Sequence, residues 1–379
     1  MKRIGLTTGK FFPMHLGHEG LIEFGAGMLD ELIVLVSSPV QLIVDHPSDD
    51  NLVVKGTTLV SYLYDRTEII RKKYANNPKI KVVYIADVIG EPAAYDQHGT
   101  AIDEEFWRKW LDVFRLVAPQ ATHFVSSDRY GKEAAKRLGL EWLPFDPDRE
   151  LVDISATRIR NDPLKHWKYI SKEFRNWYGR VVTVVGAESS GKSTLAKDVA
   201  REWGSPYVPE YGRIITEAVG DGKWTKDHFA AIVAGQRRMV DHAVRNSDNG
   251  LVICDTDIWT TALYAHEYLG SNVEEYYYEH REDGFEGSHI VAVPPNIPWV
   301  QDGKRIMPNQ DDREKFFWKS TDLYRAADVL LITATDRHAR VAQVNEYIYN
   351  HVLGHTTISP QVNLRTDQCK NQVLHAQQT

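Results

Sequence analysis

The 379-residue sequence has only two cysteines, Cys254 and Cys369, and they lie far apart. Neither has another cysteine or a histidine at metal-ligand spacing, so we expect no disulfide framework and no structural zinc site, and a cytoplasmic protein. No run of 18 apolar residues is present, so no membrane span is expected. The first residues lack the apolar core of a signal peptide.

The sequence also lacks a long basic block. It has 45 Lys and Arg residues against 52 Asp and Glu residues, which gives a net charge of −7. Proteins dedicated to nucleic-acid binding carry a basic patch or stripe, so we expect no nucleic-acid partner. The 42% hydrophobic and 26% charged residues are ordinary for globular proteins, and the length suits two or three domains.

Short β-branched segments alternate with helical patterns in the first half of the chain. This alternation predicts an α/β fold whose parallel sheet is covered by helices on both faces. The expected strands span residues 3–6, 31–36, 81–85 and 123–126, and the expected helices span 19–28, 59–74, 104–117 and 130–138.

A second series of β-branched segments predicts a second α/β domain with a parallel sheet. Its expected strands span residues 180–185, 251–254, 289–293 and 329–332, with a short strand-like stretch at 206–209. We therefore predict one domain at residues 1–172 and another at 179–353. Residues 354–379 are polar and show no sustained periodicity, which indicates a mobile tail.

A glycine- and histidine-containing motif, GKFFPMHLGH, follows the first expected strand at residues 9–18. A tight strand-to-helix turn leaves backbone N–H groups and the positive end of a helix dipole at the carboxyl edge of the sheet, where phosphates bind. His15 and His18 then stand where they can donate hydrogen bonds to phosphate oxygens. Two alternatives remain open, namely a metal site and a chance pair of surface histidines.

This motif resembles the GxFxPxHxGH signature of the nucleotidyltransferase superfamily, and ISATRIR at residues 154–160 resembles that superfamily's second motif, ISxTxxR. Ser155 is a good N-cap, and the helix that it starts would present Ser155, Thr157 and Arg160 to a triphosphate. The resemblance implies a Rossmann-like fold that transfers an adenylyl or cytidylyl group to a phosphate-bearing acceptor.

In such enzymes the acceptor phosphate attacks ATP directly, so no covalent intermediate is expected. Catalysis then consists of positioning and charge neutralisation with Mg²⁺. The resemblance assigns this role to Lys10, His15, His18 and Arg160, and it adds Gly9, Phe11 and Arg158 to the ATP-binding residues.

A complete P-loop pattern, GAESSGKST, stands at residues 186–194 between an expected strand and an expected helix. Its glycines allow backbone N–H groups to wrap the phosphates, Lys192 neutralises the charge of the β- and γ-phosphates, and Ser193 is placed to ligate Mg²⁺. The expected ATP-binding positions of the loop are Gly186, Glu188, Ser189, Ser190, Gly191, Ser193 and Thr194.

Carboxylates follow the strands that neighbour the P-loop strand. Glu210 follows the stretch 206–209, and Asp255 and Asp257 follow the strand at 251–254. Such carboxylates would face the γ-phosphate, where one holds Mg²⁺ and another accepts the proton of an attacking hydroxyl. We expect Glu210 to be the general base and Asp255 or Asp257 to serve the metal or the substrate hydroxyls. The alternative is that these carboxylates only cap helices.

A polar stretch that begins at Trp299 and includes Arg305, with Arg313 further on, is suited to a lid that closes basic groups over ATP. A solvated loop is the alternative. The sequence contains no NKxD guanine motif, which argues against a G-protein.

An adenylyltransferase motif pair followed by a P-loop kinase resembles the bifunctional NadR family, in which nicotinamide mononucleotide adenylyltransferase is fused to ribosylnicotinamide kinase. The resemblance covers roughly residues 1–350 and includes the segments 106–110, 210–213, 255–261 and 299–305. It implies that the kinase phosphorylates the 5′-hydroxyl of nicotinamide riboside and that the first domain adenylylates the mononucleotide to NAD. The implied small-molecule partners are therefore ATP, the riboside, the mononucleotide and NAD.

The same resemblance implies aromatic residues that stack on the cationic nicotinamide ring. Trp107 or Trp110 would do so in the first site, and Tyr211, Trp224 or Trp299 in the second, where Arg213 joins the substrate-binding set. The alternative for the tryptophan pair is a place in the core.

Two features differ from relatives. Pro209 stands where relatives carry an aromatic residue, and the first strand starts at residue 3 with no helix-turn-helix before it, so DNA-binding regulation is not implied. Two other functions remain open: the same folds acting on a different acceptor and nucleoside, and a nucleotide-sensing regulator without turnover. The intact motif residues argue against the regulator, and a homo-oligomer remains open.

Overall fold

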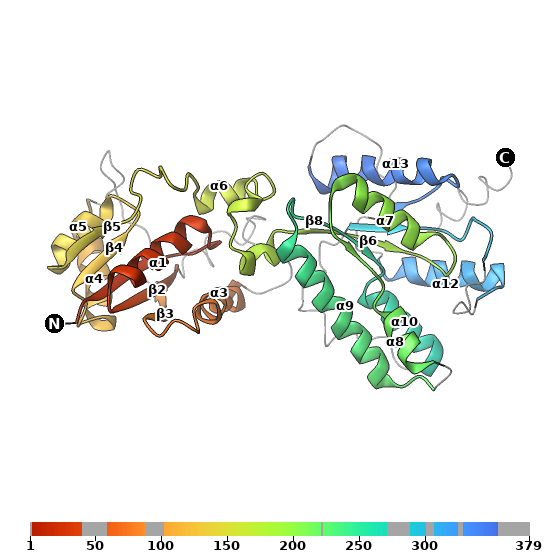
Figure 1. The fold of residues 1–379 in the computed structure, drawn as a ribbon, viewed down its shortest axis with the longest axis horizontal. Helices are drawn as coiled ribbons and strands as arrows, with labels where there is room; N and C mark the ends of the chain where they lie inside the picture. Colours follow the sequence, from red (N-terminus) through yellow and green to blue (C-terminus); the bar gives the residue numbers. More distant parts are fainter. Residues whose placement is uncertain are drawn as a thin grey trace. The chain divides into compact units, whose positions relative to one another are not determined.

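The computed structural model describes residues 2–39, 59–87, 102–220, 223–270, 289–300, 307–324 and 329–354. The chain divides into two compact units, Met1–Arg175 and Asn176–Thr379 (Figure 1). Each unit contains a five-stranded parallel sheet between helices, which confirms the predicted α/β class. The predicted tail lies outside the described residues, except for Gly354.

The sheet of the first unit has the strand order β3-β2-β1-β4-β5. Because the order changes direction at β1, the carboxyl ends of β1 and β4 flank the crevice where ligands bind in folds of this kind. The edge strand β5 was not predicted. The five strands are β1 (Ile4–Gly9), β2 (Glu31–Pro39), β3 (Ile80–Asp87), β4 (His123–Ser126) and β5 (Glu141–Pro144).

The helices of the first unit cover both faces of its sheet (Figure 1). On one face, Leu6 and Leu35 pack with Phe114 of α4 and Ala134 of α5. On the other, α1 approaches so closely that its Gly25 lies against Leu32. The helices are α1 (Leu16–Met28), α3 (Leu59–Lys73), α4 (Glu104–Val117), α5 (Tyr130–Leu138) and α6 (Ala156–Asn161), with 3-10 turns at Trp167–Tyr169 and Lys172–Trp177.

The sheet of the second unit has the order β10-β9-β6-β8-β7. Strands β6 and β8 are buried along almost their whole length, as expected for central strands covered on both faces. All five strands were predicted within two residues. They are β6 (Arg180–Val185), β7 (Tyr207–Val208), β8 (Leu251–Asp255), β9 (His289–Ala292) and β10 (Val329–Leu331).

Helices cover both faces of the second sheet, and α9 also packs against β7 and β8. Val182 and Val184 of β6 share a core with α7, α13 and the π-helical turn that follows α13, whereas Val185 shares a core with α10 and α12. The helices are α7 (Lys192–Trp203), α8 (Gly212–Val219), α9 (Lys226–Asn246), α10 (Ile258–Leu269), α12 (Gln310–Asp322) and α13 (Arg337–Tyr347), and the π-helical turn spans Ile348–Val352.

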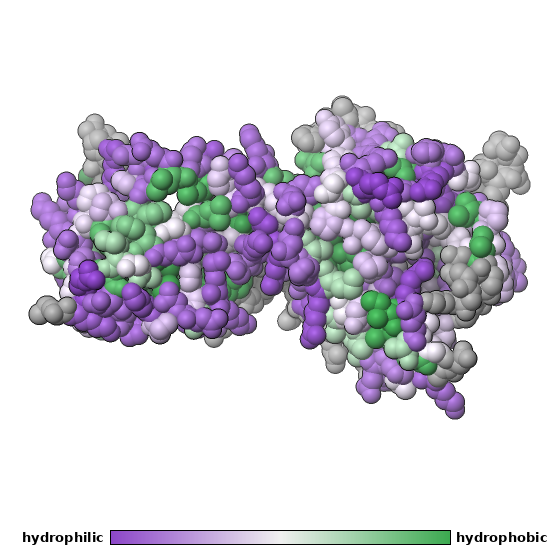
Figure 2. All heavy atoms as spheres, viewed as in Figure 1, coloured by the Kyte–Doolittle hydropathy of each residue, from purple (hydrophilic) through white to green (hydrophobic). Residues whose placement is uncertain are grey.

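Hydrophilic residues cover most of the visible surface of each unit, and hydrophobic ones form small patches between them (Figure 2). No helix within the described residues is long and apolar enough to cross a bilayer.

Candidate active sites

The first motif lines a cavity of about 490 Å³ at the carboxyl ends of β1, β2 and β4. Residues from α1, α4 and α6 complete its walls, so segments that are distant in sequence meet around one space. The predicted site residues that line it are Gly9, Lys10, Phe11, His15, His18, Trp107, Trp110, Ser155, Thr157 and Arg160. Arg158 is the exception, because its guanidinium donates to the Asp153 carboxylate at 2.8 Å.

The two histidines form a stacked pair at the start of α1, with ring centroids 3.7 Å apart. Helix α1 begins at Leu16, earlier than predicted, because His15 occupies the N-cap position. The backbone N–H of His15 donates to Nδ1 of His18 at 3.4 Å, which leaves the Nε2–H of His18 as its donor.

Both histidines are neutral at pH 7. Burial, followed by the charge of Arg149, lowers the pKa of His15 to about 4. Burial, His15 and Arg149 together hold the pKa of His18 well below its usual value. Neutral rings can donate hydrogen bonds to phosphates, but they add no positive charge before a ligand binds. The charge expected from the histidines is therefore supplied in this cavity by lysine and arginine side chains.

Helix α6 is tied to the first motif. Ser155 caps α6 as predicted, since its Oγ accepts the backbone N–H of Arg158 at 3.2 Å. Arg160 donates to the carbonyl of Phe12 at 2.6 Å and to Oγ1 of Thr157 at 3.1 Å. The two motifs thus form one hydrogen-bonded assembly.

The tryptophans of α4 differ in burial. Trp107 is 2% exposed, belongs to the core with Leu111 and Phe114, and has the Arg137 guanidinium 5.0 Å from its ring centroid. Trp110 is only partly buried and lines the cavity. Of the two, Trp110 is the better placed to meet a ligand, while Trp107 takes the core position given as the alternative.

Sequence motifs missed two arginines in the first unit. Arg66 of α3 is 1% exposed and donates to the carbonyl of Lys10. Arg66 lies four residues before the fully buried Ile70, so the two share one face of the helix. An arginine on an apolar helix face was the sequence pattern that could have identified it. Arg149 lines the cavity, and no motif marked it.

The P-loop of the second unit has the backbone that its glycines allow. Gly186 has φ +148°, and a Cβ there would lie 2.3 Å from the carbonyl oxygen of Val293. Gly191 has φ +91° and stands at the N-cap of α7. Lys192 donates to the carbonyl of Ala187 at 2.8 Å, which holds its ammonium over the loop. Thr194 lies exposed on the first turn of α7.

Charged side chains gather beside this loop. Arg213 donates to Glu210 at 3.2 Å and lies 3.5 Å from Oγ of Ser193. Burial and the nearby Asp255 raise the pKa of Glu210, although Lys192 and Arg213 oppose the shift. The structure thus brings together the carboxylates and the P-loop lysine that were predicted to share a site.

Asp255 fits a magnesium-binding role. It is buried at the end of β8, and its Oδ2 accepts a hydrogen bond from the Tyr207 hydroxyl at 3.3 Å. Its Oδ1 is also buried and makes no hydrogen bond within the described part of the chain. A carboxylate oxygen and the Ser193 hydroxyl are ligands that Mg²⁺ accepts together with phosphate oxygens. The described residues contain no cluster of three His, Cys, Asp or Glu side chains that could hold a metal alone, and this includes the His15 region.

Asp257 has the capping contacts that were given as the alternative. Its carboxylate accepts the backbone N–H of Thr260 at 2.9 Å at the start of α10 and the Tyr324 hydroxyl at 2.7 Å. Burial raises its pKa. These contacts engage the Asp257 carboxylate within the fold, so Asp255 is better placed than Asp257 to bind Mg²⁺.

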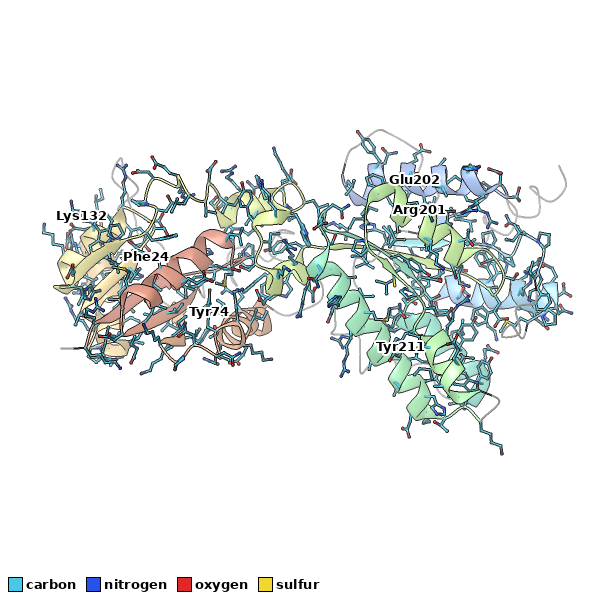
Figure 3. The ribbon with its side chains drawn as sticks, viewed as in Figure 1. Phe24, Tyr74, Lys132, Arg201, Glu202 and Tyr211 are labelled. Atoms are coloured by element: carbon cyan, nitrogen blue, oxygen red, sulfur yellow. The ribbon has the colours of Figure 1, made fainter. Side chains whose placement is uncertain are left out.

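The aromatic residues suggested for the second site have different surroundings. Tyr211 lies beside α9 (Figure 3), and its ring is so close to Gly235 that a Cβ there would meet it at 2.2 Å. Trp224 packs on Phe229 and Tyr268, with ring centroids 5.2 and 5.8 Å away. Both rings are packed against the helices of this region.

Trp299 lies next to the P-loop, because the adjacent Val300 N–H donates to Oγ of Ser189 at 2.9 Å. Glu188 similarly accepts the N–H of Met307 at 3.1 Å. Arg305 lies outside the described residues. Arg313 is buried in α12 rather than in a polar lid.

A further arginine missed by sequence motifs supports the P-loop. Arg340 of α13 is buried and donates to the carbonyl of Ser190 at 2.7 Å and to that of Ala334 at 2.9 Å. The guanidinium therefore links the P-loop to the segment before α13. Ser190 and Arg340 are 150 residues apart, so no local sequence pattern indicated this contact.

Comparisons with known proteins agree with this architecture. A family model described as an AAA domain matches residues 181–340. The Trifunctional NAD biosynthesis/regulator proteins NadR of Salmonella typhimurium and Escherichia coli are each 27% identical over 328 residues, which is 83% of this chain and 74% of theirs.

Two crystal structures of NadR, one in complex with NAD and AMP-PNP and one in complex with NR, are each 24% identical. Their TM-scores are 0.66 and 0.68, and each match covers 95% of this chain and 98% of the other. The chain is therefore a NadR-like protein, with an adenylyltransferase-like unit followed by a P-loop kinase-like unit.

Proposed function

We propose that this chain makes NAD in two ATP-dependent steps. Its second unit phosphorylates nicotinamide riboside, and its first unit transfers the adenylyl group of ATP to the resulting mononucleotide. The observation that carries this proposal is the presence in one chain of a cavity lined by both nucleotidyltransferase motifs and of a P-loop at the start of α7, together with similarity to NadR proteins over 83% of the chain.

In the first unit, a phosphate oxygen of the mononucleotide attacks the α-phosphorus of ATP. The bond between the α-phosphorus and the bridging oxygen breaks, and pyrophosphate leaves with the electron pair. This nucleophile is already an anion, so the step needs no general base. The carboxylates that line the cavity already have partners and are not needed as bases: Asp128 lies 3.5 Å from the Arg149 guanidinium, and Asp146 accepts backbone N–H groups.

His15, His18, Lys10 and Arg160 would hold the phosphates, with the histidines as neutral donors and the other two as cations. Gly9, Phe11, Ser155 and Thr157 shape the wall of the same cavity. Trp110 is the proposed platform for the cationic nicotinamide ring.

In the second unit, the 5′-hydroxyl of the riboside attacks the γ-phosphorus of ATP. Glu210 takes the hydroxyl proton, the bond between the γ-phosphorus and its bridging oxygen breaks, and ADP leaves. The raised pKa of Glu210 suits a general base. Lys192 and the P-loop N–H groups hold the phosphates, and Ser193 and Asp255 would hold Mg²⁺, which neutralises phosphate charge when bound.

Chromatographic separation of products tests the proposal. Purified protein is incubated with Mg-ATP and either nicotinamide riboside or its mononucleotide, beside the variants Lys192→Ala and His18→Ala. We expect NAD from both substrates, with Lys192→Ala blocking only the riboside route and His18→Ala stopping at the mononucleotide.

The other outcomes separate the alternatives. NAD from the mononucleotide alone would make the P-loop unit a different kinase or a nucleotide sensor. No product from either substrate would refute the proposal and direct the search to other nucleosides and phosphate acceptors.

A further inference from the structure

We propose that Arg149 is a phosphate-binding residue of the first unit, in addition to the residues of the two motifs. Its guanidinium would contact a phosphate group of a nucleotide in the 490 Å³ cavity that it lines. This inference rests on the proposed function for the identity of the nucleotide, but it can be tested with an inorganic phosphate ligand.

A tightly hydrogen-bonded loop presents this arginine to the cavity. Asp146 accepts three backbone N–H groups with its carboxylate, from Glu150 at 2.7 Å, Leu151 at 3.1 Å and Val152 at 3.0 Å. The backbone N–H of Arg149 also donates to the carbonyl of Asp146 at 3.0 Å. The loop is therefore fixed by its own polar groups before any ligand arrives.

The backbone of the loop is strained at the residue of interest. Arg149 has φ +56° and Asp146 has φ +46°, both in the left-handed region that non-glycine residues rarely adopt. Strain of this kind persists where the surrounding structure enforces it, and it is concentrated at functional sites. The hydrogen bonds of Asp146 maintain the strained backbone. The strained conformation in turn places Arg149 at the wall of the cavity.

The guanidinium has only long contacts with the described residues. Nη2 lies 3.5 Å from Oδ1 of Asp128, and Nη1 lies 3.5 Å from the carbonyl oxygen of Ile154. The side chain is 45% exposed. Arg66 and Arg160 differ, because each donates to a carbonyl of the first motif. Arg149 therefore has donors available for a ligand, whereas Arg66 and Arg160 each use at least one donor on the backbone of the first motif.

The ligand class follows from the neighbours. His15 and His18 line the same cavity, and the charge of Arg149 contributes to the lowered pKa of both. Two neutral donors beside a guanidinium form a site for an anion. A planar guanidinium can bind two oxygens of one phosphate group, which gives both charge and orientation.

Pyrophosphate, the inorganic product of the proposed transfer, is a direct probe of this site. It is titrated calorimetrically into full-length protein that carries Lys192→Ala, so that the P-loop contributes less to binding. The same titration is made with Arg149→Gln and with Arg149→Lys added. Arg129→Ala is the matched control, because Arg129 is an exposed arginine that pairs with Asp148 beside the same loop and does not line the cavity.

We expect Arg149→Gln to weaken pyrophosphate binding by about 10- to 100-fold, the range for loss of a hydrogen bond to a charged group. Arg149→Lys should recover part of the affinity, and Arg129→Ala should leave it unchanged. A change below about twofold in Arg149→Gln, or no pyrophosphate binding by the Lys192→Ala parent, would overturn the inference. Thermal unfolding of each variant shows whether the fold survives, and Arg149→Lys keeps the test valid if Arg149→Gln does not fold.

Steady-state kinetics then separate this inference from the proposed function. If the wild type makes NAD from the mononucleotide, a higher KM for ATP or for the mononucleotide in Arg149→Gln shows which phosphate is held. If the wild type makes no NAD but pyrophosphate binding still depends on Arg149, the proposed function fails and the phosphate site stands.

Discussion

The two units have their proposed phosphate sites at the same point of similar sheets, but the two sites consist of different groups. Both sites follow the strand at which the strand order changes direction, β1 in one sheet and β6 in the other. The first site relies on side chains, including the neutral histidines His15, which is buried, and His18, which is partly buried. The second relies on a glycine-containing backbone loop with Lys192 and nearby carboxylates.

The difference matches the nucleophile that each unit would use. A phosphate acceptor needs no deprotonation, so the first cavity can devote its groups to binding phosphates. A hydroxyl acceptor must lose a proton, and among the described residues the second site has a carboxylate for this step, Glu210, beside its phosphate loop, with a pKa that burial raises. Nucleophile chemistry therefore explains the contrast better than fold does, since both folds are parallel α/β sheets.

The largest effect is expected when the proposed general base, Glu210, is removed. Glu210→Gln should lower kcat of riboside phosphorylation by roughly 10²- to 10⁴-fold and leave adenylyl transfer unchanged. Because burial raises the pKa of Glu210, the carboxylate becomes protonated above the ordinary glutamate pKa of about 4.3. The kinase activity of the wild type should therefore begin to fall at a pH above that value as the pH is lowered. The variant should lack this decline. Steady-state rates across pH measure both effects.

The control for this substitution is Glu202→Gln. Glu202 lies at the far end of α7 beside α13 (Figure 3), where it accepts a hydrogen bond from Asn345. It should keep the wild-type rate and pH profile. A similar rate loss in both variants would remove the proposed role of Glu210.

The next largest effect concerns the buried His15. The pKa of His15 is about 4 in the folded chain and about 6.5 when unfolded, so the unfolded state binds a proton first as the pH falls. The free energy of unfolding of the first unit should therefore be unaffected by His15 above pH 6.5 and decrease by about 3 kcal/mol between pH 6.5 and 4.

Hydrogen exchange resolved by peptide measures this loss in α1. His15→Asn should flatten the pH dependence, whereas His242→Asn, at an exposed position on α9, should not. An equal pH slope in the wild type and His15→Asn would show that the ring is not buried in neutral form.

Substituting one helical glycine in each unit should change the free energy of unfolding by a smaller amount, with opposite signs in the two units. Gly235→Ala should destabilise the second unit by about 1–3 kcal/mol, because the added methyl group would meet the Tyr211 ring at 2.2 Å. Gly27→Ala should leave the first unit unchanged or stabilise it by up to about 1 kcal/mol, because a Cβ at that position would meet no described atom within 4 Å beyond the backbone of α1 itself.

Thermal unfolding of both variants checks this pair. If Gly235→Ala retained full stability, Tyr211 would not be packed on α9. Its ring would then be available to stack on the substrate, as the sequence predicted.

The smallest effect compares two helix caps. Ser155→Ala and Thr225→Ala each remove a side-chain acceptor at the start of a helix, α6 and α9 respectively, and each should cost about 1 kcal/mol. Only Ser155 lines a site, so Ser155→Ala should also raise the KM for ATP in adenylyl transfer. Denaturant unfolding and kinetics test the pair, and an equal KM in both variants would limit Ser155 to capping.

Long β-branched strands and complete motifs were predictable because local sequence determines them. Strand β5 was missed because its four residues, EWLP, are short and no position in them is fully buried. The start of α1 was missed because histidine is not a usual N-cap. These errors come from weak local signals rather than from an unusual fold.

Side-chain partners could not be predicted in the same way. The sequence brought Asp255 and Asp257 to the same strand end, but only the Tyr324 and Thr260 contacts separate their surroundings. Arg149 likewise depends on hydrogen bonds that Asp146 makes within its loop. Residue type and spacing placed the two aspartates near the site, but side-chain hydrogen bonds, within one loop for Arg149 and to the distant Tyr324 for Asp257, decide which groups face it.

The π-helical turn after α13 has a practical consequence for dissecting the protein. The AAA-domain match ends at residue 340, yet Val344, Ile348 and Val352 belong to the same core as Val182 and Val184. A kinase fragment cut at residue 340 would expose that core to water and should aggregate, while one extended to Gly354 keeps it covered. The border suggested by sequence similarity is therefore about one helix short of a fragment that can be expected to stay soluble.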